Sequence, residues 1–185
     1  TPSGQANHFG ANFSPDPGSV YATRDLKRDL VTAKILWSPC DATREAANEQ
    51  VVMDWKNYNT RDGRPIPNKA LSYVFIQGGD FGRPSTILAA TRNLTTADLV
   101  SARWAGADEL DKNDKPLKTA MTGLFVGQGQ MVMADGSARL CNDGDLSSAG
   151  MIVKPHIESV GGVTLGHAST RVLHGYGKTD QTEKV

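Results

Sequence analysis

The sequence predicts an α+β domain in which one amphipathic helix near the N-terminus packs on an antiparallel β-sheet, with extended arms at both ends. The chain has 185 residues, enough for one domain with a core and additional arms. It contains 19 glycines and 9 prolines but only 6% aromatic residues, which favours many turns and few long helices. One long segment has helical periodicity, and several short apolar runs are separated by turn residues, as strands are.

Three regions follow one another along the chain. Residues 1–22 are rich in Gly, Pro, Ser and Asn and are expected to form an extended arm. Residues 23–150 are expected to form the globular domain. Residues 151–185 are expected to form a β-rich extension that ends in a polar tail.

The clearest helical pattern covers residues 23–37, with Thr23 as its N-cap. Apolar side chains recur there at i, i+4, i+7 and i+11, so they lie on one face of a helix. These residues are Leu26, Leu30, Ala33 and Trp37. The Ser38-Pro39 pair ends the helix, because a residue that precedes proline is driven out of the helical region.

A second, short helix is expected over residues 41–50, capped by Asp41. Strands are predicted where short apolar runs are bounded by glycine, proline or polar residues, and residues 71–76 give the strongest signal. In the globular domain these runs are residues 51–55, 71–76, 85–90, 120–126, 131–133 and 138–141. In the C-terminal extension they are residues 151–153, 157–163 and 170–173.

The most informative segment is residues 127–140, where Asp135 and Gly136 separate two of these strands. Asp-Gly between strands predicts a β-hairpin with a two-residue primed turn, since both turn positions need a positive φ.

The charge balance limits the classes of partner. The chain has 20 Lys and Arg residues and 20 Asp and Glu residues. Proteins that bind nucleic acid or anionic membranes usually have a basic excess, so neither partner is expected. No run of eighteen apolar residues occurs, and no membrane segment is therefore predicted in this chain.

Two groups of side chains suggest metal binding. Asp143 and Asp145 lie two residues apart beside a glycine, which is similar to a fragment of a calcium loop; a solvated turn is the alternative. His156, His167 and His174 lie in the C-terminal quarter, but their spacing is wider than that of most zinc sites. No cofactor other than calcium is expected.

Catalytic patterns are missing from the sequence, and the chain is predicted not to be an enzyme. It has no G-x-S-x-G nucleophile elbow, and no particular pair of acids stands out. Aromatic residues could form a sugar-binding platform, although such residues more often lie in a core or interface. They are Trp37, Trp55, Trp104, Tyr58 and Tyr73.

Four segments in order resemble the globular part of a known family. These are residues 35–44, 71–75, 83–94 and 127–140. They are similar to motifs of type II secretion-type pseudopilins of planctomycetes and verrucomicrobia, which carry an H-X9-DG signature. The motif residues in this chain are Pro39, Asp41, Arg92, Asn93, Asp135 and Gly136. The chain departs from the family at Phe125, where the signature has histidine, and at Ala90-Thr91, where it has Gly-Asp.

The resemblance implies a pilin-like fold and a non-enzymatic structural subunit that assembles with copies of itself. The expected product is a filament, pilus or tube, outside the cell or at its surface. Because Cys40 and Cys141 both flank family motifs, the resemblance also suggests a disulfide between them; two free thiols are the alternative. A viral or phage coat subunit, a surface glycan-binding module and an acid-pair hydrolase are the rival functions.

Overall fold

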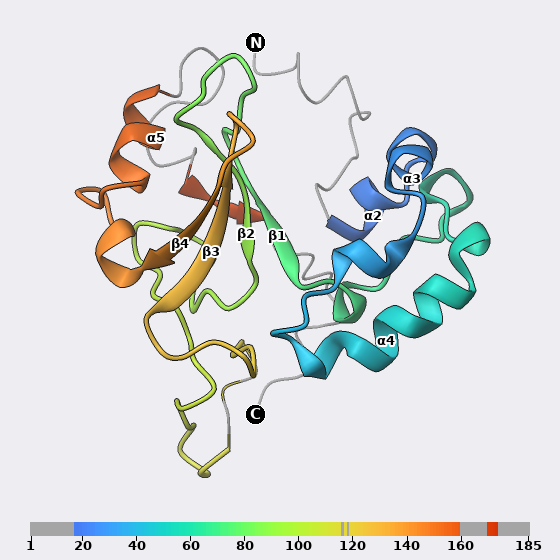
Figure 1. The fold of residues 1–185 in the computed structure, drawn as a ribbon, viewed down its shortest axis with the longest axis horizontal. Coiled ribbons are helices and arrows are strands. Elements are labelled where there is room, and N and C mark those ends of the chain that lie inside the picture. The colour runs from blue at the N-terminus through green and yellow to red at the C-terminus, as the bar shows by residue number, and fades with distance from the viewer. Residues whose placement is uncertain (1–16, 116, 118, 160–169, 174–185) are drawn as a thin grey trace.

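The computed structural model describes residues 17–115, 117, 119–159 and 170–173. Within them a five-stranded antiparallel sheet lies beside a group of helices, which confirms the α+β class (Figure 1). Across these described ranges, every helix is too short or too polar to cross a bilayer.

The helical part lies along the β1 side of the sheet (Figure 1). Its buried side chains form a cluster of their own: Ala22, Ala33, Leu36, Val51, Ile66, Ala70 and Leu71. Its elements are α2 (Pro17–Tyr21), α3 (Arg24–Leu30) and α4 (Ala42–Met53), with 3-10 turns at Ala33–Leu36, Trp55–Asn57, Thr60–Asp62 and Asn68–Ala70. The prediction of an arm over residues 1–22 is therefore wrong for α2, and residues 1–16 lie outside the described part of the chain.

The predicted continuous helix over residues 23–37 is wrong. Helix α3 ends at Leu30, where Val31 takes a φ of 64° and the Thr32 N–H donates to the Leu30 carbonyl at 2.7 Å. No residue of α3 is buried, so the predicted apolar face does not pack on the sheet. The Thr23 side chain does not cap the helix but donates to the Val20 carbonyl at 2.8 Å.

Buried Asn48 explains why the chain breaks there. Its side-chain amide donates to the carbonyls of Ala33 and Ala70, each at 3.0 Å. These two bonds join α4 to the turns Ala33–Leu36 and Asn68–Ala70, so tertiary hydrogen bonds favour the broken form over the local helical pattern.

Helix α4 is longer than predicted and includes most of the expected strand 51–55. Val51 is buried on the same side of α4 as Asn48, at i+3, so Val51 extends the buried face of this helix. Asp41 occupies the N-cap position, but its carboxylate makes no capping bond.

The sheet has the strand order β4-β3-β2-β1-β5. Its strands are β1 (Tyr73–Ile76), β2 (Ile87–Thr91), β3 (Gln128–Met133), β4 (Ala138–Asn142) and β5 (Val172–Leu173). These confirm the strand predictions at 71–76, 85–90, 131–133, 138–141 and 170–173. Residues 120–126 form no strand, and Met121 makes an isolated bridge with Gly106.

The predicted strands at 151–153 and 157–163 are wrong where the chain is described. Residues Val153–Ser159 form helix α5, whose Val153 and Ile157 pack with Ile152 on the core side of the sheet. His156 on this helix is fully buried, and its Nδ1 accepts a hydrogen bond from the Ile87 N–H at 3.0 Å.

Strand β3 shows how the sheet divides into two faces. Gly129, Met131 and Met133 are buried, and the alternate residues Gln128, Gln130 and Val132 are exposed. The buried face joins the larger core cluster, whose fully buried members include Trp104, Ile87, Leu94 and Leu99. The opposite face of the β3–β4 hairpin is open to solvent.

The hairpin forms as predicted, but its turn differs. The Met133 N–H donates to Ser137 O at 2.9 Å and the Gly136 N–H to Met133 O at 3.0 Å, which encloses a three-residue loop. Gly136 has a φ of 83°, and Asp135 does not have a positive φ. A turn followed by a left-handed glycine bulge also joins strands well, so Asp-Gly selects this longer loop here.

Candidate functional site

Two of the motif residues named in the sequence analysis meet in a buried ion pair. Asp41 lies immediately before α4, and Arg92 immediately after β2. The Arg92 Nε donates to Asp41 Oδ2 at 2.7 Å and Nη2 donates to Oδ1 at 2.6 Å. The Arg92 side chain is 8% exposed and the Asp41 side chain is 0% exposed. The two therefore form a two-bond, charge-assisted pair away from solvent.

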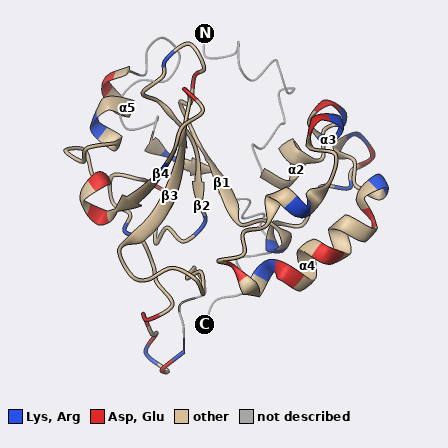
Figure 2. Ribbon diagram, viewed as in Figure 1, with Lys and Arg blue, Asp and Glu red and all other residues tan. Residues whose placement is uncertain are grey.

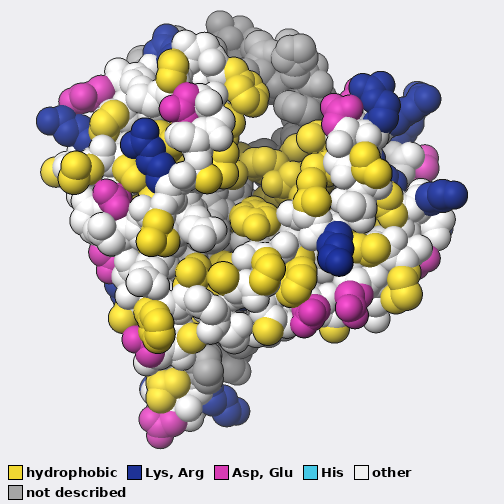
Figure 3. Space-filling view, in the orientation of Figure 1, with side chains coloured by type: hydrophobic (Ala, Val, Ile, Leu, Met, Phe, Trp, Pro, Cys, Tyr) yellow, Lys and Arg dark blue, Asp and Glu magenta, His cyan; other side chains and the backbone are white. Residues whose placement is uncertain are grey.

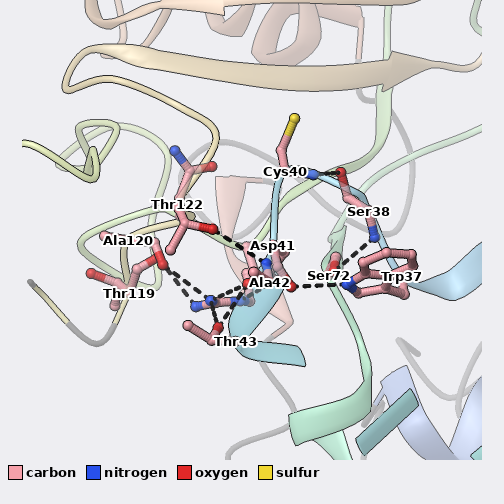
Figure 4. Close-up of polar contacts among 12 residues, drawn as sticks. Trp37, Ser38, Cys40, Asp41, Ala42, Thr43, Ser72, Thr119, Ala120 and Thr122 are labelled. Carbon is pink, nitrogen blue, oxygen red and sulfur yellow. Dashed lines mark hydrogen bonds and ion pairs between the residues drawn. The ribbon is translucent and has the colours of Figure 1, made fainter. Parts of the chain in front are cut away.

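Other groups complete the surroundings of the pair, as Figure 4 shows. The Arg92 guanidinium also donates to the carbonyls of Thr119 and Ala120, at 3.2 and 3.1 Å. The Thr43 hydroxyl accepts from Arg92 at 3.0 Å and donates to Asp41 Oδ1 at 2.9 Å. A buried ion pair is tolerated when its remaining polar atoms find such partners.

Backbone contacts tie the segment around Asp41 to its neighbours. The Trp37 indole N–H donates to the Asp41 carbonyl at 2.8 Å, and the Ser38 N–H donates to the Ser72 hydroxyl at 3.0 Å (Figure 4). The Arg92 N–H in turn donates to the Ser72 carbonyl at 3.0 Å. The segment that contains Pro39 is therefore held to the start of β1 and to the end of β2.

The 119–123 segment closes the other side of this network. The Thr122 hydroxyl accepts from the Ala42 N–H at 3.3 Å, and the Gly123 N–H donates to the Cys40 carbonyl at 2.9 Å. A Cβ at Gly123 would lie 2.8 Å from the Cys40 Cα, so this approach requires glycine. Segments that are distant in sequence thus join the helical part to the sheet.

Asn93, the next motif residue, performs a similar role one position further on. Its side-chain amide donates to the carbonyls of Ala105 and Gln128, both at 2.8 Å, and the residue is fully buried. It therefore connects the chain after β2 to the start of β3.

The last two motif residues do not belong to this network. Asp135 and Gly136 are exposed in the β3–β4 turn, where Asp135 Oδ1 accepts from the Ser137 N–H at 2.8 Å. Hydrogen bonds from the Ser137 side chain and backbone lower the pKa of Asp135. These hydrogen bonds stabilise the turn, so Asp135 and Gly136 have a structural role there.

The carboxylates predicted to bind calcium hold backbone groups. Asp143 Oδ1 accepts from the Trp104 N–H at 2.7 Å, and Asp145 Oδ2 accepts from the Asn142 N–H at 2.8 Å. The second bond completes a capping box on the short turn Asp143–Asp145. Nowhere in the described ranges do three or more His, Cys, Asp or Glu residues gather as a metal site would require.

Cys40 and Cys141 are free thiols in the structure. Cys141 is 2% exposed, and burial raises the pKa of its thiol to about 11, with a smaller contribution from Asp145. Cys40 is half-buried beside Gly123.

The tryptophans do not form one sugar-binding platform. Trp104 is fully buried in the core of the sheet, where a Cβ at Gly129 would approach its Cε3 to 2.1 Å. Trp55 packs on the helical cluster with the Lys27 ammonium 4.7 Å from its ring centre, and burial lowers the pKa of Lys27. His167 and His174, two of the predicted metal ligands, lie outside the described residues.

No protein-family model, curated protein or solved structure matches this chain. The interpretation of the site therefore rests on its geometry. Sequence reasoning found Asp41, Arg92 and Asn93 through the motifs but missed Thr43 and Ser72, because short hydroxyl side chains give no pattern that marks them as partners.

Proposed function

We propose that the chain is a non-enzymatic structural subunit of pilin-like type that assembles with copies of itself into a filament, pilus or tube outside the cell or at its surface. The observation that carries the proposal is the buried Asp41–Arg92 pair. Both charged groups bind each other, so the motif holds two parts of the subunit together and offers no free acid or base for chemistry.

Exposed apolar side chains on the subunit support contacts between copies. Phe125, at the position of the family histidine, is 65% exposed, and Val126 beside it is 45% exposed. On the sheet, Leu140 is 70% exposed. Figure 3 shows hydrophobic side chains spread over both the sheet and the helical part on one side of the molecule. Such surfaces favour protein contacts when they lie in patches.

Charge does not oppose close packing of copies. Figure 2 shows acidic and basic residues interspersed along the helices and the long loop before β3. The net charge of the chain is zero. Copies with no net charge repel one another little, so contacts between them need not overcome long-range repulsion.

Imaging of the purified 185-residue chain by negative-stain electron microscopy tests the proposal. Filaments or tubes that grow with protein concentration are expected, because contacts between unlike surfaces propagate without closing. Closed shells would favour a coat-type subunit instead. Monodisperse monomers at the highest soluble concentration would contradict self-assembly.

A further inference from the structure

Among the strands that the structure describes, none pairs with the outer edge of β4. The strand is last in the sheet order, and its partner β3 covers only one side. The Asn142 N–H points away from β3, because it donates to Asp145. Backbone groups alternate along a strand, so the N–H and C=O groups of Ala138 and Leu140 also point outward.

On the open face of the sheet, β4 carries two apolar side chains, Ala138 and Leu140, followed by the polar Asn142. Leu140 is 70% exposed and Val132, on the neighbouring strand, is 39% exposed. Ala138 lies directly across from Val132 in the register. An unpaired edge with an apolar flank is a template for an added strand. Charged side chains on an edge strand oppose such pairing, and β4 carries only one, Arg139.

A segment of the same chain has the matching sequence pattern. In residues 7–13, NHFGANF, the apolar side chains Phe9, Ala11 and Phe13 alternate with polar or small residues. Residues 1–15 contain no Asp, Glu, Lys or Arg, so insertion beside β4 would bury no charge. We infer that residues 7–13 of one copy pair as an added strand with the open edge of β4 of a second copy.

The position of Pro17 explains why the edge belongs to a second copy. Pro17 is buried at the start of α2, whose Tyr21 packs on Phe75 of β1 with ring centres 4.9 Å apart. Strand β4 lies three strand spacings from β1, roughly 14 Å. Helix α2 lies on the other side of β1 from β4 (Figure 1). A strand added outside β4 would lie four spacings from β1, roughly 19 Å. The four steps from Phe13 to Pro17 span at most about 14 Å, so residues 7–13 cannot align along their own β4.

This inference rests on the proposed function and specifies its contact: each copy donates an arm and accepts one. Such a head-to-tail contact is heterologous, and it builds open chains of copies when the rotation between them does not close. The apolar face of the arm would cover Leu140 and Val132, and the outward groups of Ala138 and Leu140 would gain backbone partners.

Complementary variants of the 185-residue chain test the inference by sedimentation velocity. F9K/F13K removes the donor pattern, and L140K blocks the acceptor edge. A138P is a second acceptor variant, since it removes an outward N–H at the first residue of an edge strand, where proline is tolerated. Matched controls are Q5K/S14K in the arm and M53K, at a residue of α4 that is 78% exposed.

The wild-type chain and both controls are expected to assemble, and each donor or acceptor variant alone is expected to be monomeric. An equimolar mixture of F9K/F13K with L140K is expected to form one-to-one dimers, because one variant retains the edge and the other retains the arm. Assembly of the donor and acceptor variants like wild type, or a mixture that stays monomeric, would overturn the inference and leave the proposed function standing. A wild-type chain that is monomeric at every concentration would overturn both.

Discussion

Replacement of Arg92 by methionine gives the sharpest test of the interpretation of the buried pair. The substitution keeps much of the side-chain length but removes the two bonds to Asp41 and the bonds to Thr43, Thr119 and Ala120. The Asp41 carboxylate, 0% exposed, would keep only the hydroxyl of Thr43 among the side-chain partners described above. A buried charge left without its partner costs about 3–5 kcal/mol in free energy of unfolding.

Replacement of Asp41 by asparagine should cost less, about 2 kcal/mol, because Arg92 keeps the Thr119 and Ala120 carbonyls and the amide oxygen of the new side chain can still accept one hydrogen bond. The double variant should be more stable than the sum of the two losses predicts, since the second substitution removes the group that the first left unpaired. A coupling energy above about 1 kcal/mol is expected.

Urea denaturation followed by circular dichroism measures these free energies, with the midpoint shift as the readout. Arg103→Met is the matched control, because Arg103 also forms a two-bond pair with Glu109 but is 47% exposed. It should change the free energy of unfolding by about 1 kcal/mol or less. The reasoning would be refuted if Arg92→Met lowered the free energy of unfolding no more than the control does. It would also be refuted if the effects of the two single substitutions were strictly additive in the double variant.

Three further predictions concern the backbone and the thiols. Val31→Gly should stabilise the fold by about 1 kcal/mol in urea denaturation, because a β-branched residue at a φ of 64° is strained and its side chain is 76% exposed; destabilisation would contradict this. Gly129→Ala should destabilise by about 2–3 kcal/mol and shift the Trp104 fluorescence, since the added Cβ would lie 2.1 Å from the indole; an unchanged melting temperature would contradict the packing. Iodoacetamide at pH 8 should label Cys40 readily and Cys141 only after unfolding, because burial raises the pKa of the Cys141 thiol to about 11; two fast thiols would contradict this, and none at all would indicate the disulfide.

The sheet was predictable because its strands carry a local signal. Residues 128–133 alternate between exposed and buried positions, and a glycine follows Asp135 where the hairpin turns. The helical part was less predictable, because its geometry depends on distant residues. The periodic pattern of residues 23–37 runs through Val31, yet the hydrogen bonds of Asn48 hold the chain in a broken form there.

The candidate site, like the helical part, could be predicted only in part from local sequence patterns. Asp41 and Arg92 each lie in a motif that the sequence reveals, but they are 51 residues apart, and no local pattern states that they pair. Asp41 could equally have capped α4, which is what its position predicts. The buried Arg92 guanidinium decides between the two roles, because it binds the Asp41 carboxylate. This contact exists only in the folded chain.

The mass of the 185-residue chain in solution, measured by light scattering over a wide range of concentration, tests the proposed function most directly. The proposal predicts a mass that rises with concentration without settling at a fixed small multiple of the 19.8 kDa monomer, because open assembly has no defined end. A constant monomer mass over the whole range would contradict the proposal that this chain is a self-assembling structural subunit.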